Sequence, residues 1–146
     1  MAIAPFPHTY SVSLEGGELA ANPRAPIRAG APSQFGGSDD VWSPEHLLVS
    51  AALLCLKTTF DAYARRERLA VHKWSGTATG TLAKGKEGPV FTSIDLDVDI
   101  ETDAGEEARV LATLVTAERN CLISRALSAP VRLTSRVIAP PTRAVG

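Results

Sequence analysis

The sequence predicts an α+β fold, because its strands come in adjacent runs instead of alternating one by one with helices. Two observations support this prediction. A region of short extended segments precedes one long apolar helix, and a hairpin of two long strands follows it. At 146 residues the chain is sized for a single domain, residues 1–146 with a mobile tail at 139–146, and can bury an ordinary core without disulfides.

Composition and charge exclude several classes of protein. Hydrophobic residues make up 45% and charged residues 21%, which is typical of soluble globular domains. A net charge of −1 provides no general attraction to nucleic acid or to anionic lipid. The first ten residues contain no Lys or Arg, unlike a secretory signal, and the longest apolar stretch, residues 47–56, is too short to span a bilayer. We therefore expect a cytoplasmic protein with no nucleic acid or membrane partner.

The N-terminal third predicts short strands and a loop. Residues 8–31 read as short extended segments with a turn at residues 15–18, and their prolines keep the strands short or at an edge. Residues 35–42 read as a loop, because Gly, Ser and Asp cluster there.

The clearest helix start is at residues 43–45, where a serine hydroxyl at the N-cap precedes a proline and a glutamate. We predict a helix from there to about residue 66 or 68. Between residues 47 and 56 its apolar side chains point in every direction around the axis, so the helix must be covered on all sides. One small sheet covers only one side. A second helix and a second copy of the chain are expected to cover the rest, which predicts an obligate homodimer.

The second half predicts a hairpin, then a helix and a strand. Residues 70–84 and 89–101 form the best strand pair. A helix is predicted to begin at Asp103, with Glu106 completing a capping box, and to end near Asn120. A short segment at 121–127 and a last strand at 131–138 follow. One face of the hairpin is acidic, and we expect it to be solvated and to bind no metal; its residues are Asp95, Asp97, Asp99 and Glu101.

The chemistry-bearing residues are the two cysteines, Cys55 and Cys121. Taken alone, either could be a small core hydrophobe. A zinc site is not favoured, because the three histidines show no ligand spacing to either cysteine. His46 cannot serve Cys55 as a base within one straight helix, because nine residues separate them by roughly 13 Å along the axis.

The contexts of both cysteines resemble one known family. The segment Ser43-Pro44-Glu45-His46-Leu47-Leu48, followed by Ala51-Ala52-Leu53-Leu54-Cys55, is similar to the Pro-Glu-x-Leu, Ala-Ala and Cys signature of the OsmC/Ohr family of thiol peroxidases. That family unites osmotically induced protein C and the organic hydroperoxide resistance protein. The segment 117–127, around Cys121, is similar to the family's Ala-x-x-x-Cys-Pro-x-Ser-x-x-Leu.

The resemblance implies a fold, an activity and site residues. The fold would be an intertwined homodimer with antiparallel sheets wrapped around long central helices. Cys55 would attack an organic hydroperoxide, and Cys121 would resolve the sulfenic acid into a disulfide that a thiol reductant recycles. Glu45 would help to hold an arginine over the reactive thiol. No metal and no cofactor are implied.

The sequence departs from the family at three positions. Glu18 and Gln34 stand where the two branches of the family carry the arginine, and Leu122 replaces the family's proline. Arg24 and Arg28 are candidate replacements for the arginine. An alternative function therefore remains open, namely a family member without efficient peroxidase activity that binds a small apolar ligand at the dimer interface.

Overall fold

The computed structural model describes residues 4–141 and divides into two compact units, Met1–Leu47 and Leu48–Gly146. From residue 142 onward the predicted mobile tail lies outside the described residues. That the chain forms a single domain stays a prediction. The first unit contains a three-stranded antiparallel sheet of β1 (Ser13–Glu15), β2 (Glu18–Ala20) and β3 (Ile27–Arg28), followed by the 3₁₀-helix η1 (Ser33–Phe35). These are the short strands that the prolines predict.

The long helix α1 (Pro44–Glu67) begins where the sequence predicts. The Ser43 side chain is fully buried, and its hydroxyl accepts a hydrogen bond from the backbone N–H of His46 at 3.1 Å. This bond satisfies one of the free amides of the first turn, which is the function of an N-cap. The His46 ring also hydrogen-bonds the same hydroxyl at 2.6 Å, so the ring belongs to the cap.

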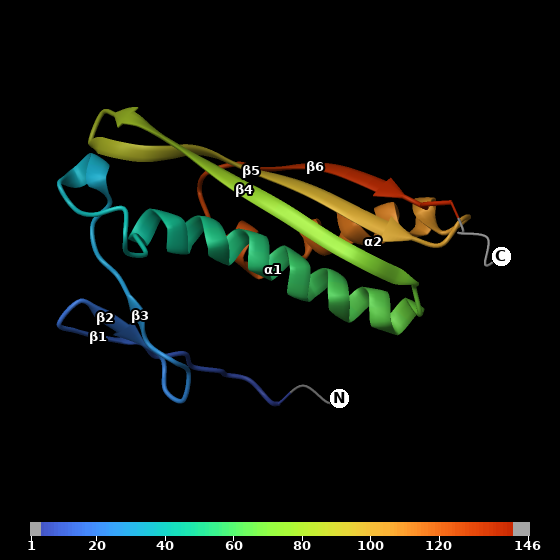
Figure 1. The fold of residues 1–146 in the computed structure, drawn as a ribbon, viewed down its shortest axis with the longest axis horizontal. Helices are drawn as coiled ribbons and strands as arrows, with labels where there is room; N and C mark the ends of the chain where they lie inside the picture. The colour runs from blue at the N-terminus through green and yellow to red at the C-terminus, as the bar shows by residue number, and fades with distance from the viewer. Residues whose placement is uncertain (1–3, 142–146) are drawn as a thin grey trace. The chain divides into compact units, whose positions relative to one another are not determined.

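The predicted hairpin is confirmed as β4 (Val71–Gly85) and β5 (Gly88–Thr102), two antiparallel strands joined by a two-residue turn. The last strand, β6 (Val131–Ile138), pairs in parallel with β5, so that the second unit contains a sheet in the order β4-β5-β6 (Figure 1). The helices and the two sheets confirm the α+β class. The expectation of antiparallel sheets is wrong for the second sheet, because β6 runs parallel to β5.

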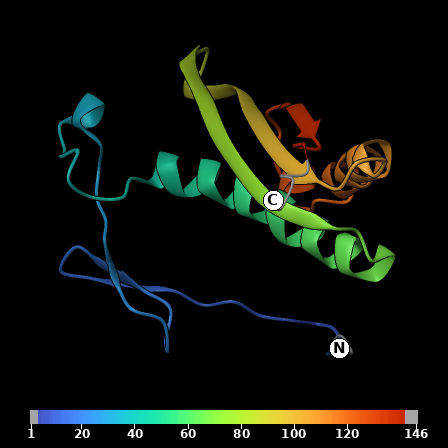
Figure 2. The same ribbon diagram turned by 45° about the vertical axis from the view of Figure 1, so that its right-hand side comes forward.

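Both long helices cover one face of this sheet (Figures 1 and 2). Every second side chain of β5 points into the core, from Ile94 to Ile100, and the acidic side chains between them point the other way. The core is completed by α1 and by α2 (Glu107–Arg119). The buried helix residues are Ala52, Leu56, Phe60 and Ala64 from α1 and Val110, Leu114 and Ala117 from α2.

Two glycines of β4 let α1 lie close to the sheet. A Cβ atom added at Gly80 would lie 2.6 Å from a methyl group of Val49, and one added at Gly76 would lie 3.0 Å from a methyl group of Leu53. A contact below 3.0 Å, as at Gly80, requires the backbone or the neighbour to move, and a contact of 3.0 Å, as at Gly76, is tighter than most real Cβ contacts. The glycines therefore fix how closely the helix that carries Cys55 packs on the sheet.

The predicted start of the second helix is wrong. The helix α2 begins at Glu107, not at Asp103, and Glu106 at the N-cap makes no side-chain capping bond. Gly105 has φ +91°, a left-handed conformation that ends the turn at Asp103 before the helix starts. The Glu107 carboxylate instead accepts a hydrogen bond from the backbone N–H of Gly105 at 2.8 Å.

The apolar surface of α1 is only partly covered within one chain. Leu54 is 63% exposed although it lies in the middle of the apolar stretch. By length and composition alone, the whole helix α1 is long and apolar enough to cross a membrane. The sequence expectation considered only the shorter apolar run of residues 47–56. The length and composition of α1 are weak evidence for a membrane span, because the core helices of soluble proteins meet the same criterion, and α1 packs one side on the sheet.

Candidate active site

The structure brings the two cysteines together, although 66 positions separate them in the sequence. Cys55 lies at the middle of α1 and is half-buried, with its sulfur 3.9 Å from the Thr59 hydroxyl one helical turn later. Cys121 is fully buried at the N-cap of the short helix α3 (Leu122–Ala126), which places it beside Cys55. Both thiols are free.

The surroundings of Cys55 favour its thiolate. Burial by itself raises the pKa of Cys55, but hydrogen bonding to the Cys121 thiol and to the backbone N–H of Ile123 lowers it. The Thr59 hydroxyl and the backbone N–H of Leu122 lower it further, so that the net shift of the pKa is downward. The two amides belong to the first turn of α3, where N–H groups have no partner within the helix. Cys55 therefore ionises more readily than an ordinary cysteine, and the thiolate is the reactive form of a thiol.

The pKa of Cys121 moves the opposite way. Burial raises it, and so does the neighbouring Cys55, while the hydroxyl and backbone N–H of Ser124 oppose the rise. Ionisation is thus favoured at Cys55 and opposed at Cys121. A chemically asymmetric dithiol of this kind is suited to an attack by one sulfur followed by condensation with the other.

Glu45 does not join this pair within one chain. The helix α1 runs without interruption from Pro44 to Glu67, so Glu45 and Cys55 are separated by roughly 15 Å along its axis. One carboxylate oxygen of Glu45 is buried and has no hydrogen-bond partner among residues 4–141. A buried carboxylate oxygen without a donor is unfavourable.

Sequence reasoning missed three contributors to the site. Thr59 could have been found, because residues i and i+4 share a helix face and Thr59 is four residues after Cys55. The amides of Leu122 and Ile123 could not, because a backbone group has no sequence signature and its direction depends on where α3 begins.

Each group that lowers the pKa of Cys55 is uncharged. Arg24 lies in a bend and Arg28 in β3, both within the first unit, and their suggested function as replacements for the family arginine stays a prediction. The described part of the chain contains no cluster of histidine, cysteine or acidic side chains that could hold a metal ion.

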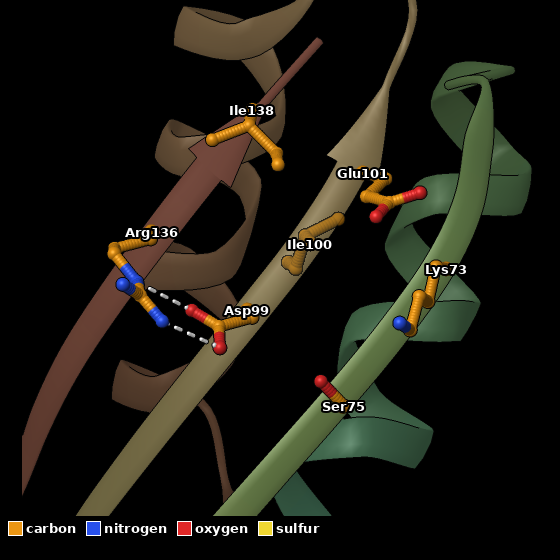
Figure 3. A pocket seen from close by; sticks show the side chains of 7 residues that line it. All are labelled: Lys73, Ser75, Asp99, Ile100, Glu101, Arg136 and Ile138. Carbon is orange, nitrogen blue, oxygen red and sulfur yellow. Dashed lines mark hydrogen bonds and ion pairs between the residues drawn. The ribbon is translucent and has the colours of Figure 1, made fainter. Parts of the chain in front are cut away.

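A groove lies over strands β4, β5 and β6, on the face of the sheet that carries Asp99 (Figure 3). Arg136 of β6 donates two hydrogen bonds to Asp99 of β5, at 2.8 and 2.9 Å, and the pair lies directly opposite in the strand register. The groove is lined by Lys73, Ser75, Asp99, Ile100, Glu101, Arg136 and Ile138. The acidic face is thus exposed, as expected, and an arginine of β6 partly neutralises it.

A family model and several solved structures match this chain. The family model for OsmC-like proteins matches residues 37–136. No curated protein sequence matches the chain significantly.

Solved structures of low sequence identity share the fold. An OsmC-like protein from Mycoplasma pneumoniae has a TM-score of 0.75 at 14% identity, over 91% of this chain and 99% of that one. An organic hydroperoxide resistance protein OsmC from Legionella pneumophila has a TM-score of 0.70 at 18% identity, over 89% and 96%. An organic hydroperoxide resistance protein from Elizabethkingia anophelis has a TM-score of 0.72 at 17% identity, over 93% and 99%. Because the family model covers both cysteines and more than half of the residues, the chain belongs to the OsmC-like protein family.

Proposed function

We propose that the protein is a cytoplasmic thiol peroxidase that reduces organic hydroperoxides through Cys55 and Cys121. The observation that carries this proposal is the adjacent pair of free thiols whose pKa values move in opposite directions. Two relatives with the same fold are named as organic hydroperoxide resistance proteins, which supports the choice of substrate class.

The reaction uses the two sulfurs, the hydroperoxide as oxidant and an external thiol as reductant. The Cys55 thiolate attacks the terminal peroxide oxygen, the O–O bond breaks, and the alkoxide takes a proton and leaves as an alcohol. The Cys121 sulfur then attacks the Cys55 sulfenic acid, which forms the disulfide and releases water. A thiol reductant returns both residues to thiols by two successive exchanges.

A thiol titration of the purified protein tests the proposal. We expect two free thiols per chain before, and none after, addition of one equivalent of cumene hydroperoxide. The Cys55→Ser variant should consume no peroxide. The Cys121→Ser variant should react once and accumulate a sulfenic acid that a cyclic 1,3-diketone traps. Two free thiols after the peroxide would contradict the proposal.

The alternative function is binding of a small apolar ligand without turnover. It is favoured by the uncharged surroundings of Cys55, because a peroxidase gains from a cation near its developing negative charge. In the same titration it predicts unchanged thiols, together with saturable binding of an apolar fluorescent probe.

We further propose that the protein is an obligate homodimer. Leu54 on α1 and Leu122 on α3 are 63% and 66% exposed in the single chain, which a second copy would cover. We expect sedimentation to give twice the chain mass of 15.4 kDa at micromolar concentration. A folded species at the mass of one chain would contradict the dimer, and Leu54→Glu should weaken it.

In such a dimer Glu45 would serve the Cys55 of the partner. Two antiparallel central helices related by a two-fold axis bring the start of one to the middle of the other. Mixing Cys55→Ser chains with Glu45→Ala chains tests this, because half of the sites in the mixed dimer then carry both residues. Partial recovery of activity is expected. No recovery, with the mixed dimer confirmed, would show that Glu45 does not act on its partner's site.

A further inference from the structure

The Ser124 hydroxyl is a buried polar group that the reaction above does not use. Its oxygen is inaccessible to solvent and makes no hydrogen bond of ordinary geometry to any residue in the range 4–141. Buried hydroxyls are normally satisfied, so an unsatisfied one requires an explanation. Ser124 is on α3, three residues after Cys121.

Ser124 and Cys121 lie on the first turn of α3. Cys121 is the N-cap and Ser124 the third helical residue, two positions whose polar groups meet across the first turn of a helix. The turn is held by two backbone hydrogen bonds, from Arg125 N–H to Cys121 O at 3.1 Å and from Leu127 N–H to Ser124 O at 3.3 Å. The side chains of Ser124 and Cys121 are therefore fixed on the same turn.

Cys121 needs such a neighbour. Its side chain is fully buried, so no bulk solvent stabilises a negative charge on its sulfur. In the reduced pair, hydrogen bonding between the two thiols favours the negative charge on Cys55 and not on Cys121. The Ser124 hydroxyl makes no hydrogen bond to another described residue, so donating to the Cys121 sulfur would break none.

We propose that Ser124 is a positioning residue for the resolving step: its hydroxyl donates a hydrogen bond to the Cys121 sulfur as the thiolate forms and holds it toward the Cys55 sulfenic acid. This inference rests on the proposed function. The effect of Ser124 on the pKa of Cys121 agrees with this inference. Burial raises that pKa, whereas the hydroxyl and the backbone N–H of Ser124 lower it.

The step balances without a further reagent. The Cys121 sulfur forms a bond to the Cys55 sulfur as the S–O bond of the sulfenic acid breaks. The departing hydroxide takes the proton that Cys121 has lost and leaves as water, so Cys121 is oxidised and the Cys55 sulfenic acid is reduced. Ser124 keeps its own proton throughout.

The experiment compares Ser124→Ala with Ser128→Ala, a matched control at an exposed serine that follows α3. Stopped-flow kinetics with one equivalent of cumene hydroperoxide measure the oxidation of Cys55 and the formation of the disulfide as separate phases. Each pKa unit that Cys121 rises removes tenfold of its thiolate but increases its nucleophilicity roughly threefold. We therefore expect Ser124→Ala to reduce the ratio of the disulfide rate to the oxidation rate about threefold or more, and Ser124→Thr to restore it.

A second readout does not depend on peroxide. With ¹³Cβ-labelled cysteine, the chemical shift of Cys121 against pH reports its ionisation directly. Ser124→Ala should move the midpoint to higher pH, and Ser128→Ala should leave it in place. An unchanged midpoint or an unchanged rate ratio in Ser124→Ala overturns the inference. Failure of the wild-type chain to react with peroxide instead refutes the proposed function, while the titration still decides on Ser124.

Discussion

Replacing Leu122 by proline isolates one of the hydrogen bonds that favour the Cys55 thiolate. Leu122 is the first residue of α3, a position where proline fits because the N–H has no partner in the helix. The preceding residue, Cys121, has φ −67° and ψ 113°, an extended conformation that a following proline accepts. The substitution therefore removes a single donor from Cys55 and leaves the backbone as it is.

The size of the effect follows from the strength of a hydrogen bond to a charged group. Such a bond contributes about 1.5–3 kcal/mol. The Leu122 amide makes the smallest contribution among the groups that lower the pKa of Cys55, so we take its hydrogen bond to be worth about 1 kcal/mol, below that range. At pH values below the pKa this reduces the thiolate fraction about fivefold. Because a more basic thiolate is also more nucleophilic, the rate of alkylation should fall about two- to threefold.

The rate of Cys55 alkylation by iodoacetamide, followed by mass spectrometry from pH 5 to pH 10, measures this effect. The control is Leu122→Ala, which removes the same exposed side chain and keeps the N–H. We expect the midpoint of the profile to lie at higher pH in Leu122→Pro than in Leu122→Ala. Coincident profiles would refute the assignment of the Leu122 amide as a donor to Cys55.

Three further predictions concern the core and the outer face of the sheet. Leu56→Ala should reduce the free energy of unfolding by about 2–5 kcal/mol in urea, because its side chain is fully buried. Gly80→Ala should cost about 1–3 kcal/mol in the same assay, because the new Cβ would meet Val49 at 2.6 Å. Hydrogen bonding to Arg136 lowers the pKa of Asp99, so its carboxyl should titrate below ordinary aspartate by NMR and move up in Arg136→Gln. The stability that this pair contributes is present above the unfolded-state pKa and is lost as pH falls through the folded one.

Local patterns predict the hairpin and the start of α1 because their causes are local. Alternation along β5 needs only the neighbouring residues, and the cap at Ser43 needs only the next three. The start of α2 was mispredicted for a local reason as well. Asp103 and Glu106 satisfy the capping-box spacing, but Gly105 between them adopts a positive φ that the pattern ignores.

The pairing of Asp99 with Arg136 shows a different limit. Each residue is predictable as an exposed member of its own strand, yet their contact depends on β6 running parallel to β5 in one particular register. Nothing in either strand specifies that register. The meeting of Cys55 with Cys121 has the same character, because it requires α3 to start against the middle of α1. A family resemblance supplies such long-range information, whereas the spacing of residues does not.

The absence of the arginine from its two family positions does not by itself show that the Cys55 thiol is unreactive. A cation lowers the pKa of a thiol by its charge, and its absence from two family positions suggests a weak nucleophile. Here the pKa of Cys55 is nevertheless lowered, by a thiol, a hydroxyl and two backbone amides. One of these amides exists only because Leu122 replaces the proline of the family signature, so one departure from the motif partly offsets another. What an uncharged set of donors does not replace is the attraction of a full positive charge for the departing alkoxide. Under the proposed function, the chain is better equipped to form the thiolate than to release the alcohol. We expect any loss relative to an arginine-bearing peroxidase to lie in the rate of O–O cleavage and not in the ionisation of Cys55.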